Sequence, residues 1–240
     1  SNSNKTYTLG LTITNTPDGA ETLTVVPSGA TAIYDAAGNA ASTTQSNNTI
    51  SLIDKAVPTI TGTTIANDNS TIAVTFSEAV YNTLNGSGSL EVSDFVFSIS
   101  GGNATLSSTT PSSISKSGNV YTLGILLSGT ANGSETLTVK PVINSIYDIV
   151  GNIASTSQSN NTITLNDKLD PSTFTTGTVV ATGGTIVSNY WNSTNTGINI
   201  TVPVANDSTL TGGTIQIRAK IDSETYADLG SAYTIQSSDL

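Results

Sequence analysis

Apolar and polar residues alternate along several short segments of this chain. Residues 70–77 read STIAVTFS, residues 94–100 read DFVFSIS, and residues 135–141 read ETLTVKP. Successive side chains of a β-strand point to opposite faces of a sheet, so this alternation predicts strands with one buried face and one wet face. The same pattern predicts further strands over residues 120–127, 161–166, 197–204 and 213–221.

Turn-forming dipeptides separate the predicted strands. They are Asn85-Gly86, Gly101-Gly102, Gly118-Asn119 and Asn132-Gly133. Glycine and asparagine favour turns because they tolerate a positive φ. About seven short strands in roughly 110 residues, separated by such turns, is the pattern of an Ig-like sandwich.

Two blocks of sequence occur twice. Residues 7–24 (YTLGLTITNTPDGAETLT) correspond to residues 121–138 (YTLGILLSGTANGSETLT), at an offset of 114. Residues 33–55 (IYDAAGNAASTTQSNNTISLIDK) correspond to residues 146–168 (IYDIVGNIASTSQSNNTITLNDK), at an offset of 113. Two ordered blocks this similar indicate an internal repeat.

The repeat sets the predicted domain boundaries. Since the repeated blocks end at Lys55 and Lys168, residues 56–168 form one complete Ig-like repeat. Residues 1–55 are then the C-terminal half of a preceding repeat, with too few strands to close a sandwich. Residues 169–240 are the N-terminal part of a third, divergent Ig-like domain. We therefore expect an all-β chain of tandem Ig-like antiparallel β-sandwich domains in a linear array, cut from a longer array at both ends.

Charge and composition exclude several classes of function. With 7 basic and 17 acidic residues and a net charge of −10, the chain lacks the basic face that a nucleic-acid binder needs. Its charge also disfavours anionic membranes, and no apolar run reaches about 18 residues, so we expect no direct membrane insertion. It contains no Cys and no His, which removes disulfides and the usual zinc ligands. We expect no enzymatic activity, because no set of reactive residues stands out. Carboxylates with few cations suit calcium.

The motif Asp-x-x-Gly-Asn occurs twice, from Asp35 to Asn39 and from Asp148 to Asn152. It is typical of a tight turn, in which Asp accepts backbone N–H bonds and Gly adopts the left-handed conformation. The same side chains, with carbonyls freed by the turn, also offer hard oxygen ligands to calcium. Both interpretations stay open.

Further acidic residues lie at the ends of the repeats. Asp54 lies in the first linker, Asp167 and Asp170 lie in the second, and Glu78 follows the strand predicted at 70–77. Either these are solvated charges, or each linker aspartate meets the Asp-x-x-Gly-Asn loop of its own repeat and Glu78 or its equivalent in the next. A calcium ion held there would lock adjacent domains into a stiff rod. The lysine beside each linker aspartate weakens this hypothesis, because it can neutralise the carboxylate directly.

Tyr190 and Trp191 form an aromatic pair that contains the single Trp of the chain. In an Ig-like domain, such a Trp typically packs in the core between the sheets. Alternatively, the two rings form a platform on which sugars stack. The second interpretation favours a carbohydrate-binding or accessory module of a large secreted enzyme.

Three motifs carry a resemblance to a known family: VTFSEAV at residues 74–80, SDF at residues 93–95, and the repeated Tyr-Asp-x-x-Gly-Asn segment that leads to Asn-Asp-Lys. They resemble bacterial Ig-like repeats in giant surface adhesins of gliding Bacteroidota, the SprB-like gliding-motility adhesins. The resemblance implies type IX secretion, display on the cell surface and a stalk role in adhesion. It also implies contacts with neighbouring repeats of the same long chain, with surface polysaccharide, or with secretion and motility machinery.

Overall fold

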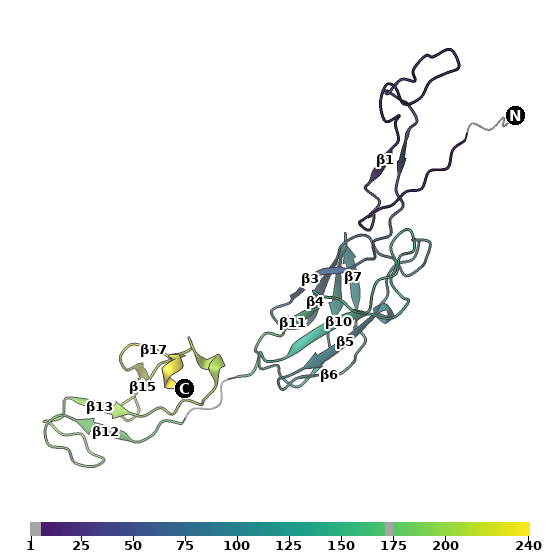
Figure 1. Ribbon diagram of the computed structural model, residues 1–240. Helices are drawn as coiled ribbons and strands as arrows, with labels where there is room; N and C mark the ends of the chain where they lie inside the picture. The colour runs from purple at the N-terminus through teal and green to yellow at the C-terminus, as the bar shows by residue number, and fades with distance from the viewer. Residues whose placement is uncertain (1–5, 171–174) are drawn as a thin grey trace. The chain divides into compact units, whose positions relative to one another are not determined.

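The computed structural model describes residues 6–170 and 175–240 (Figure 1). It divides into two compact units. The first comprises the chain up to residue 129 together with residues 134–166, and the second comprises residues 130–133 and the chain from residue 167 onward. The regular structure in the described residues is antiparallel β-sheet, with three single-turn 3-10 helices. The prediction of an all-β fold is confirmed. The predicted domain boundaries and the linear array stay predictions.

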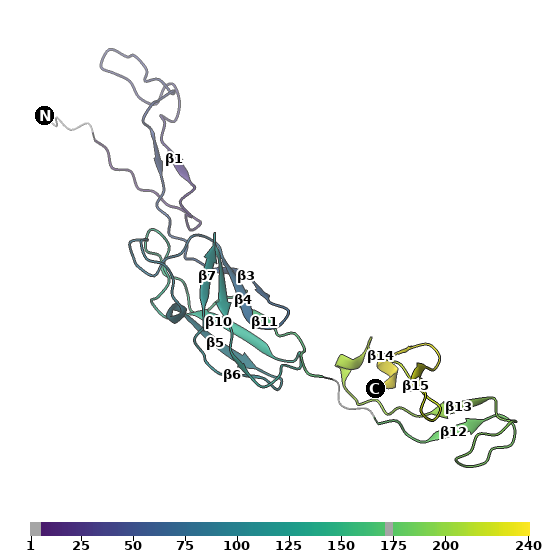
Figure 2. The same ribbon diagram turned by 180° about the vertical axis from the view of Figure 1, so that it is seen from behind.

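Most of the first unit is an antiparallel β-sandwich (Figures 1 and 2). One sheet has the order β3-β4-β8-β7, formed by Ile60–Ile65, Thr71–Phe76, Val120–Gly124 and Ile114–Ser117. The other has the order β11-β10-β5, formed by Thr162–Thr164, Thr136–Pro141 and Phe95–Ser100. A small additional ladder pairs β6 (Thr105–Leu106) with β9 (Leu127–Ser128).

The core of the sandwich lies between the two sheets. Along β4, Val74 and Phe76 are buried, and the residues between the buried positions are half-exposed, as the alternation predicts. The rings of Phe76, of Phe95 on β5 and of Tyr121 on β8 lie 5.8 to 6.3 Å apart between centroids. The buried Tyr121 hydroxyl donates to the carbonyl of Val80 at 3.1 Å. Aromatic side chains from both sheets therefore form one cluster that joins them.

Some strands differ from the sequence prediction. The segment 120–127 is divided between β8 and β9, which pair with different partners. Strand β3 was not predicted, because its sequence ITGTTI contains Gly62 and alternates poorly. The register against β4 shifts between Ile60 and Gly62, and such a bulge breaks the period-two pattern that sequence reading depends on.

The first half-repeat forms a two-stranded hairpin. Strand β1 (Thr22–Thr24) pairs with β2 (Thr49–Ser51), with Leu23 opposite Ile50. Their repeat counterparts in β10 and β11 pair in the same register, with Leu137 opposite Ile163. The same local sequence therefore forms the same local pairing in both places. Within the described chain, however, the first half-repeat has no strands that correspond to β3, β4 and β5.

The second unit consists of three two-stranded antiparallel ladders in its described residues. They pair β12 (Val179–Thr182) with β13 (Gly197–Ile200), β14 (Thr214–Ile215) with β17 (Tyr233–Thr234), and β15 (Arg218–Ala219) with β16 (Ala227–Asp228). Its buried apolar side chains in residues 175–240 are Leu210 and Ile235. This unit thus buries little apolar surface.

A pair of matched substitutions tests the position of the core. We expect Leu123→Ala on β8 to lower the free energy of unfolding by about 2–5 kcal/mol, because this side chain is fully buried. Leu9 is its repeat counterpart and is solvent-exposed, so Leu9→Ala should change stability by less than about 0.5 kcal/mol. Urea unfolding of the full chain, followed by circular dichroism, measures both. Equal losses for the two variants would contradict this core.

Candidate functional site

Three carboxylates from distant parts of the first unit lie together. Asp54, Glu78 and Asp148 each offer an oxygen, and these oxygens all lie within 4.8 Å of one another. Asp54 and Glu78 are half-buried, and Asp148 is fully buried. No other group of three acidic side chains at such distances occurs among the described residues.

A short bridge between two segments positions Glu78 near Asp148. Tyr81 and Tyr147 exchange two backbone hydrogen bonds, each 2.8 Å from nitrogen to oxygen. Glu78 lies three residues before Tyr81, just after β4 ends at Phe76, and Asp148 directly follows Tyr147. The bridge therefore holds the end of β4 beside the start of the Asp148 loop.

The loop from Asp148 to Asn152 is a tight turn built around the Asp148 carboxylate. Its Oδ1 atom accepts the backbone N–H groups of Val150, Gly151 and Asn152 at 2.9, 2.6 and 2.7 Å. Its Oδ2 atom accepts a bond from Asn152 Nδ2 at 2.6 Å. Gly151 has a φ of 95°, a left-handed conformation that glycine adopts without strain. Since each carboxylate oxygen has about two acceptor sites, Oδ2 keeps one for a cation.

The linker residue Asp54 is attached to this loop. Its carbonyl oxygen accepts a hydrogen bond from Asn152 Nδ2 at 3.2 Å. Its own Oδ1 atom accepts the N–H of Ala56 at 2.8 Å, which orients the carboxylate. Lys55 makes no ion pair with Asp54 in the described chain, so the direct neutralisation that its position suggested does not occur.

Burial and charge repulsion act on Glu78. Partial burial of its carboxyl, followed by the negative charges of Asp54, Asp148 and Asp18, raises its pKa to about 7 from an ordinary value of 4.5. Burial and nearby like charges both disfavour the ionised form. None of the Lys or Arg side chains described by the structure forms an ion pair with the cluster. The cluster therefore carries excess negative charge near neutral pH.

Asp18 is a residue of this site that sequence reading missed. With Asp54, Glu78, Thr59 and Ser77, it lines a hollow of about 320 Å³. The sequence does mark Asp18 as a turn residue, because Asp18-Gly19 corresponds to the turn dipeptide Asn132-Gly133 in the next repeat. That correspondence alone does not place the turn beside Glu78.

Asn152, also predicted as a ligand, is hydrogen-bonded to two members of the cluster, whereas the four remaining predicted ligands lie outside it. Asp35 is exposed and forms the same turn as Asp148, accepting the N–H of Asn39 at 2.8 Å and the Asn39 side-chain amide at 2.8 Å. The side-chain bond from Asn39 is the main reason that the pKa of Asp35 is lowered. Asp167 accepts the N–H of Leu169 at 2.9 Å, and both Asp167 and Asp170 are exposed.

The structure thus brings together three of the eight predicted metal ligands and a fourth acidic residue, Asp18. Asp54 does meet Glu78, as the sequence suggested. The Asp-x-x-Gly-Asn loop that completes the group is the one beginning at Asp148, in the repeat that follows the linker. The loop of the linker's own repeat, beginning at Asp35, is not part of the group.

The donor set fits calcium. Calcium takes about 6–8 oxygen ligands, which are mainly carboxylates, carbonyls and water. Asp54, Glu78 and Asp148 supply hard anionic oxygens, and Thr59 and Ser77 line the hollow beside Asp54 and Glu78. Without any His or Cys in the chain, softer metals lack their preferred ligands.

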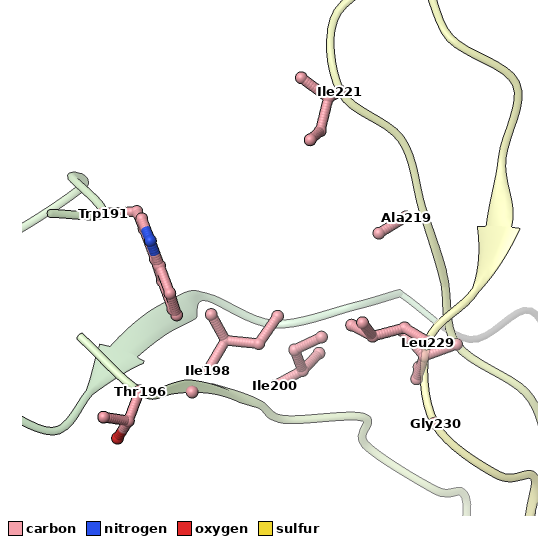
Figure 3. A pocket seen from close by; sticks show the side chains of 10 residues that line it. Trp191, Thr196, Ile198, Ile200, Ala219, Ile221, Leu229 and Gly230 are labelled. Atoms are coloured by element: carbon pink, nitrogen blue, oxygen red, sulfur yellow. The ribbon is translucent and has the colours of Figure 1, made fainter. Parts of the chain in front are cut away.

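The predicted ligand pair Tyr190 and Trp191 lies on the surface of the second unit. Both side chains are exposed, Trp191 by 59%, so Trp191 does not form a core. Trp191 lines an open hollow of about 930 Å³, and Figure 3 shows Ile198 and Ile200 beside it. Apart from Thr196, the lining side chains are apolar or aromatic, with few of the hydrogen-bonding groups that orient a sugar.

Comparison with models of protein families, with curated proteins and with solved structures found no match to this chain. Within residues 6–170 and 175–240, no helix has the length and apolar character needed to cross a bilayer.

The raised pKa of Glu78 predicts a pH-dependent stability in the absence of divalent cations. A carboxyl whose pKa is higher in the folded state stabilises the fold below its unfolded pKa, here near 4.5, and this stabilisation is lost as the pH rises through about 7. We expect Glu78→Gln, which mimics the protonated form, to melt at the same temperature as the natural chain at pH 4.5 and at a higher temperature at pH 8. Thermal melts in EDTA measure this difference.

The control removes one negative charge elsewhere. Glu224→Gln, at an exposed position in the second unit, should leave the pH dependence of melting unchanged. Equal melting temperatures of the natural chain and Glu78→Gln at pH 8 would show that the charge of Glu78 does not destabilise the fold.

Proposed function

We propose that this chain is a structural stalk segment of a large, secreted cell-surface adhesin that serves gliding motility or surface attachment. In this proposal the chain is extracellular, has no enzymatic activity, and contacts mainly neighbouring repeats. A calcium ion joins the linker after one repeat to the sandwich that follows it.

The observation that carries this proposal is the origin of the three clustered carboxylates. Asp54 belongs to the linker that ends the first half-repeat, whereas Glu78 and Asp148 belong to the following sandwich. A cation bound by all three would attach the linker to the sandwich. It would also remove the repulsion that raises the pKa of Glu78.

The rest of the chain supports a structural role. The repeated blocks are similar along their whole length, and repeats of this kind contact mainly their neighbours, so they build extended rods. The net charge of −10 disfavours self-association, which suits a chain exposed to solvent along its length. The resemblance to repeats of gliding-motility adhesins adds the expectation of type IX secretion and of surface polysaccharide or motility proteins as partners.

Calcium should stabilise the first unit. A ligand that binds only the folded state at about 100 times its Kd adds about 2.7 kcal/mol, which corresponds to roughly 5–10 °C for a unit of this size. We expect the melting temperature at pH 7.5 to rise by this amount when EDTA is replaced by saturating Ca²⁺. Differential scanning calorimetry of the full chain measures the shift.

Matched variants show whether the shift comes from the cluster. Asp54→Asn should abolish most of the calcium effect, because it removes the linker's charged ligand. Asp167→Asn, the repeat counterpart of Asp54, is exposed and outside the cluster, so it should keep the full effect. A calcium shift that survives Asp54→Asn, or that is missing in the natural chain, contradicts calcium binding at the first linker.

A carbohydrate-binding or accessory module of a secreted enzyme is the second candidate. It is favoured by the exposure of Tyr190 and Trp191, and disfavoured by the apolar lining of the hollow beside Trp191. Titration with soluble polysaccharides, followed by Trp191 fluorescence, separates the two functions. A saturable change that Trp191→Ala abolishes would support the module, and a stalk segment predicts no change.

A further inference from the structure

The first half-repeat exposes a continuous apolar face. Along residues 7–13, the side chains of Tyr7, Leu9, Leu11 and Ile13 are all exposed. Tyr7 and Leu9 also line a hollow of about 770 Å³ together with Val25, Val26, Pro27 and Ile33. Exposed apolar patches of this kind mark surfaces that bind another polypeptide or ligand.

The internal repeat gives each of these side chains a counterpart whose burial is known. Tyr7 is 87% exposed and its counterpart Tyr121 is 2% exposed. Leu9 is 72% exposed and its counterpart Leu123 is fully buried. The remaining pairs behave in the same way: Leu11 with Ile125, Val25 with Val139, and Ile33 with Ile146.

The complete repeat also shows which strands lie beside these positions in each sheet. On β8, Tyr121 pairs with Val74 of β4, and Leu123 pairs with Ile72 of β4. On β10, Val139 lies opposite Phe97 of β5. The neighbouring strands β4 and β5 both belong to residues 57–119, the first half of the complete repeat.

The exposed half already has the backbone structure of its covered counterpart over residues 17–55. Val25 donates to the Asn48 carbonyl at 2.9 Å, as Val139 does to that of Asn161 at 2.9 Å. The Asn48 side chain donates back to the Val25 carbonyl at 2.9 Å, matching a 2.7 Å bond between the counterparts. The part of the face formed by residues 17–53 is therefore preformed, which lowers its ordering cost on binding.

We propose that the apolar face of residues 7–53 is a docking surface for a half-repeat with the sequence pattern of residues 57–119. Its β4-like strand pairs with residues 6–10, and its β5-like strand pairs with β1, so that a second sandwich closes. The inference rests on the repeat and is independent of the calcium site and the adhesin role.

Residues 57–119 of the same chain cannot occupy this face, because they already pair with residues 120–166. A second molecule of the chain has the same engaged half-repeat, and would have to open its own sandwich to donate it. A further, unpaired half-repeat of the same pattern requires neither step.

A fusion tests the proposal. A second copy of residues 56–119 replaces residues 1–5 and is followed by residue 6 and the rest of the chain to Leu240. We expect amide hydrogen exchange at residues 7–11 to slow by at least about 100-fold relative to the natural chain. We also expect Leu9→Ala, nearly silent in the natural chain, to destabilise the fusion as Leu123→Ala destabilises the complete repeat.

A control fusion carries Ile72→Asp and Val74→Asp in the added copy alone, which places charges on the buried face of the strand that should pair with residues 6–10. It should leave residues 7–11 exchanging as fast as in the natural chain. The proposal is wrong if this control protects residues 7–11 as well as the first fusion does, or if neither fusion protects them. It is also wrong if the natural chain forms a dimer that already protects these residues, because a second copy is then the occupant.

Discussion

The structure depends on one constraint: the apolar face of a sheet has to be covered by a second apolar surface. In residues 57–166 the constraint is satisfied, because two sheets place Phe76, Phe95 and Tyr121 against one another. In the first half-repeat it is not, although the strands there pair in the same register. Local pairing and core formation are therefore separable in this chain, and only the second requires a complete repeat.

The acidic cluster is a consequence of the closed sandwich. The end of β4 carries Glu78, and the Tyr81–Tyr147 bridge holds the Asp148 loop beside it. The linker then adds Asp54, which Asn152 holds through the backbone carbonyl. Three carboxylates whose oxygens lie within 4.8 Å of one another repel when ionised, as the raised pKa of Glu78 indicates. A cation at this point would turn that repulsion into attraction between linker and sandwich.

The proposed function therefore depends on the linker before the sandwich as well as on the sandwich core. The sandwich core resists unfolding, whereas the linker cluster would control how the chain enters the sandwich. The second unit contributes an open apolar surface around Trp191 instead of a closed core. In the proposed stalk role, a stable core and a fixed linker would both matter, because force along the chain would pass through every linker and every repeat.

The sequence by itself determined the strands with strong alternation, such as β4 and β5, and the Asp-x-x-Gly-Asn turns, because both depend on residues close together in the chain. It also suggested that Asp54 would meet Glu78. Only the tertiary structure decided that Asp148, and not Asp35, completes the cluster, and that Asp18 lies beside it. It alone decided that Leu123 is buried while Leu9, in nearly the same local sequence, is exposed. The physical reason is that burial and charge clustering depend on segments far away in the chain, which a local pattern does not contain.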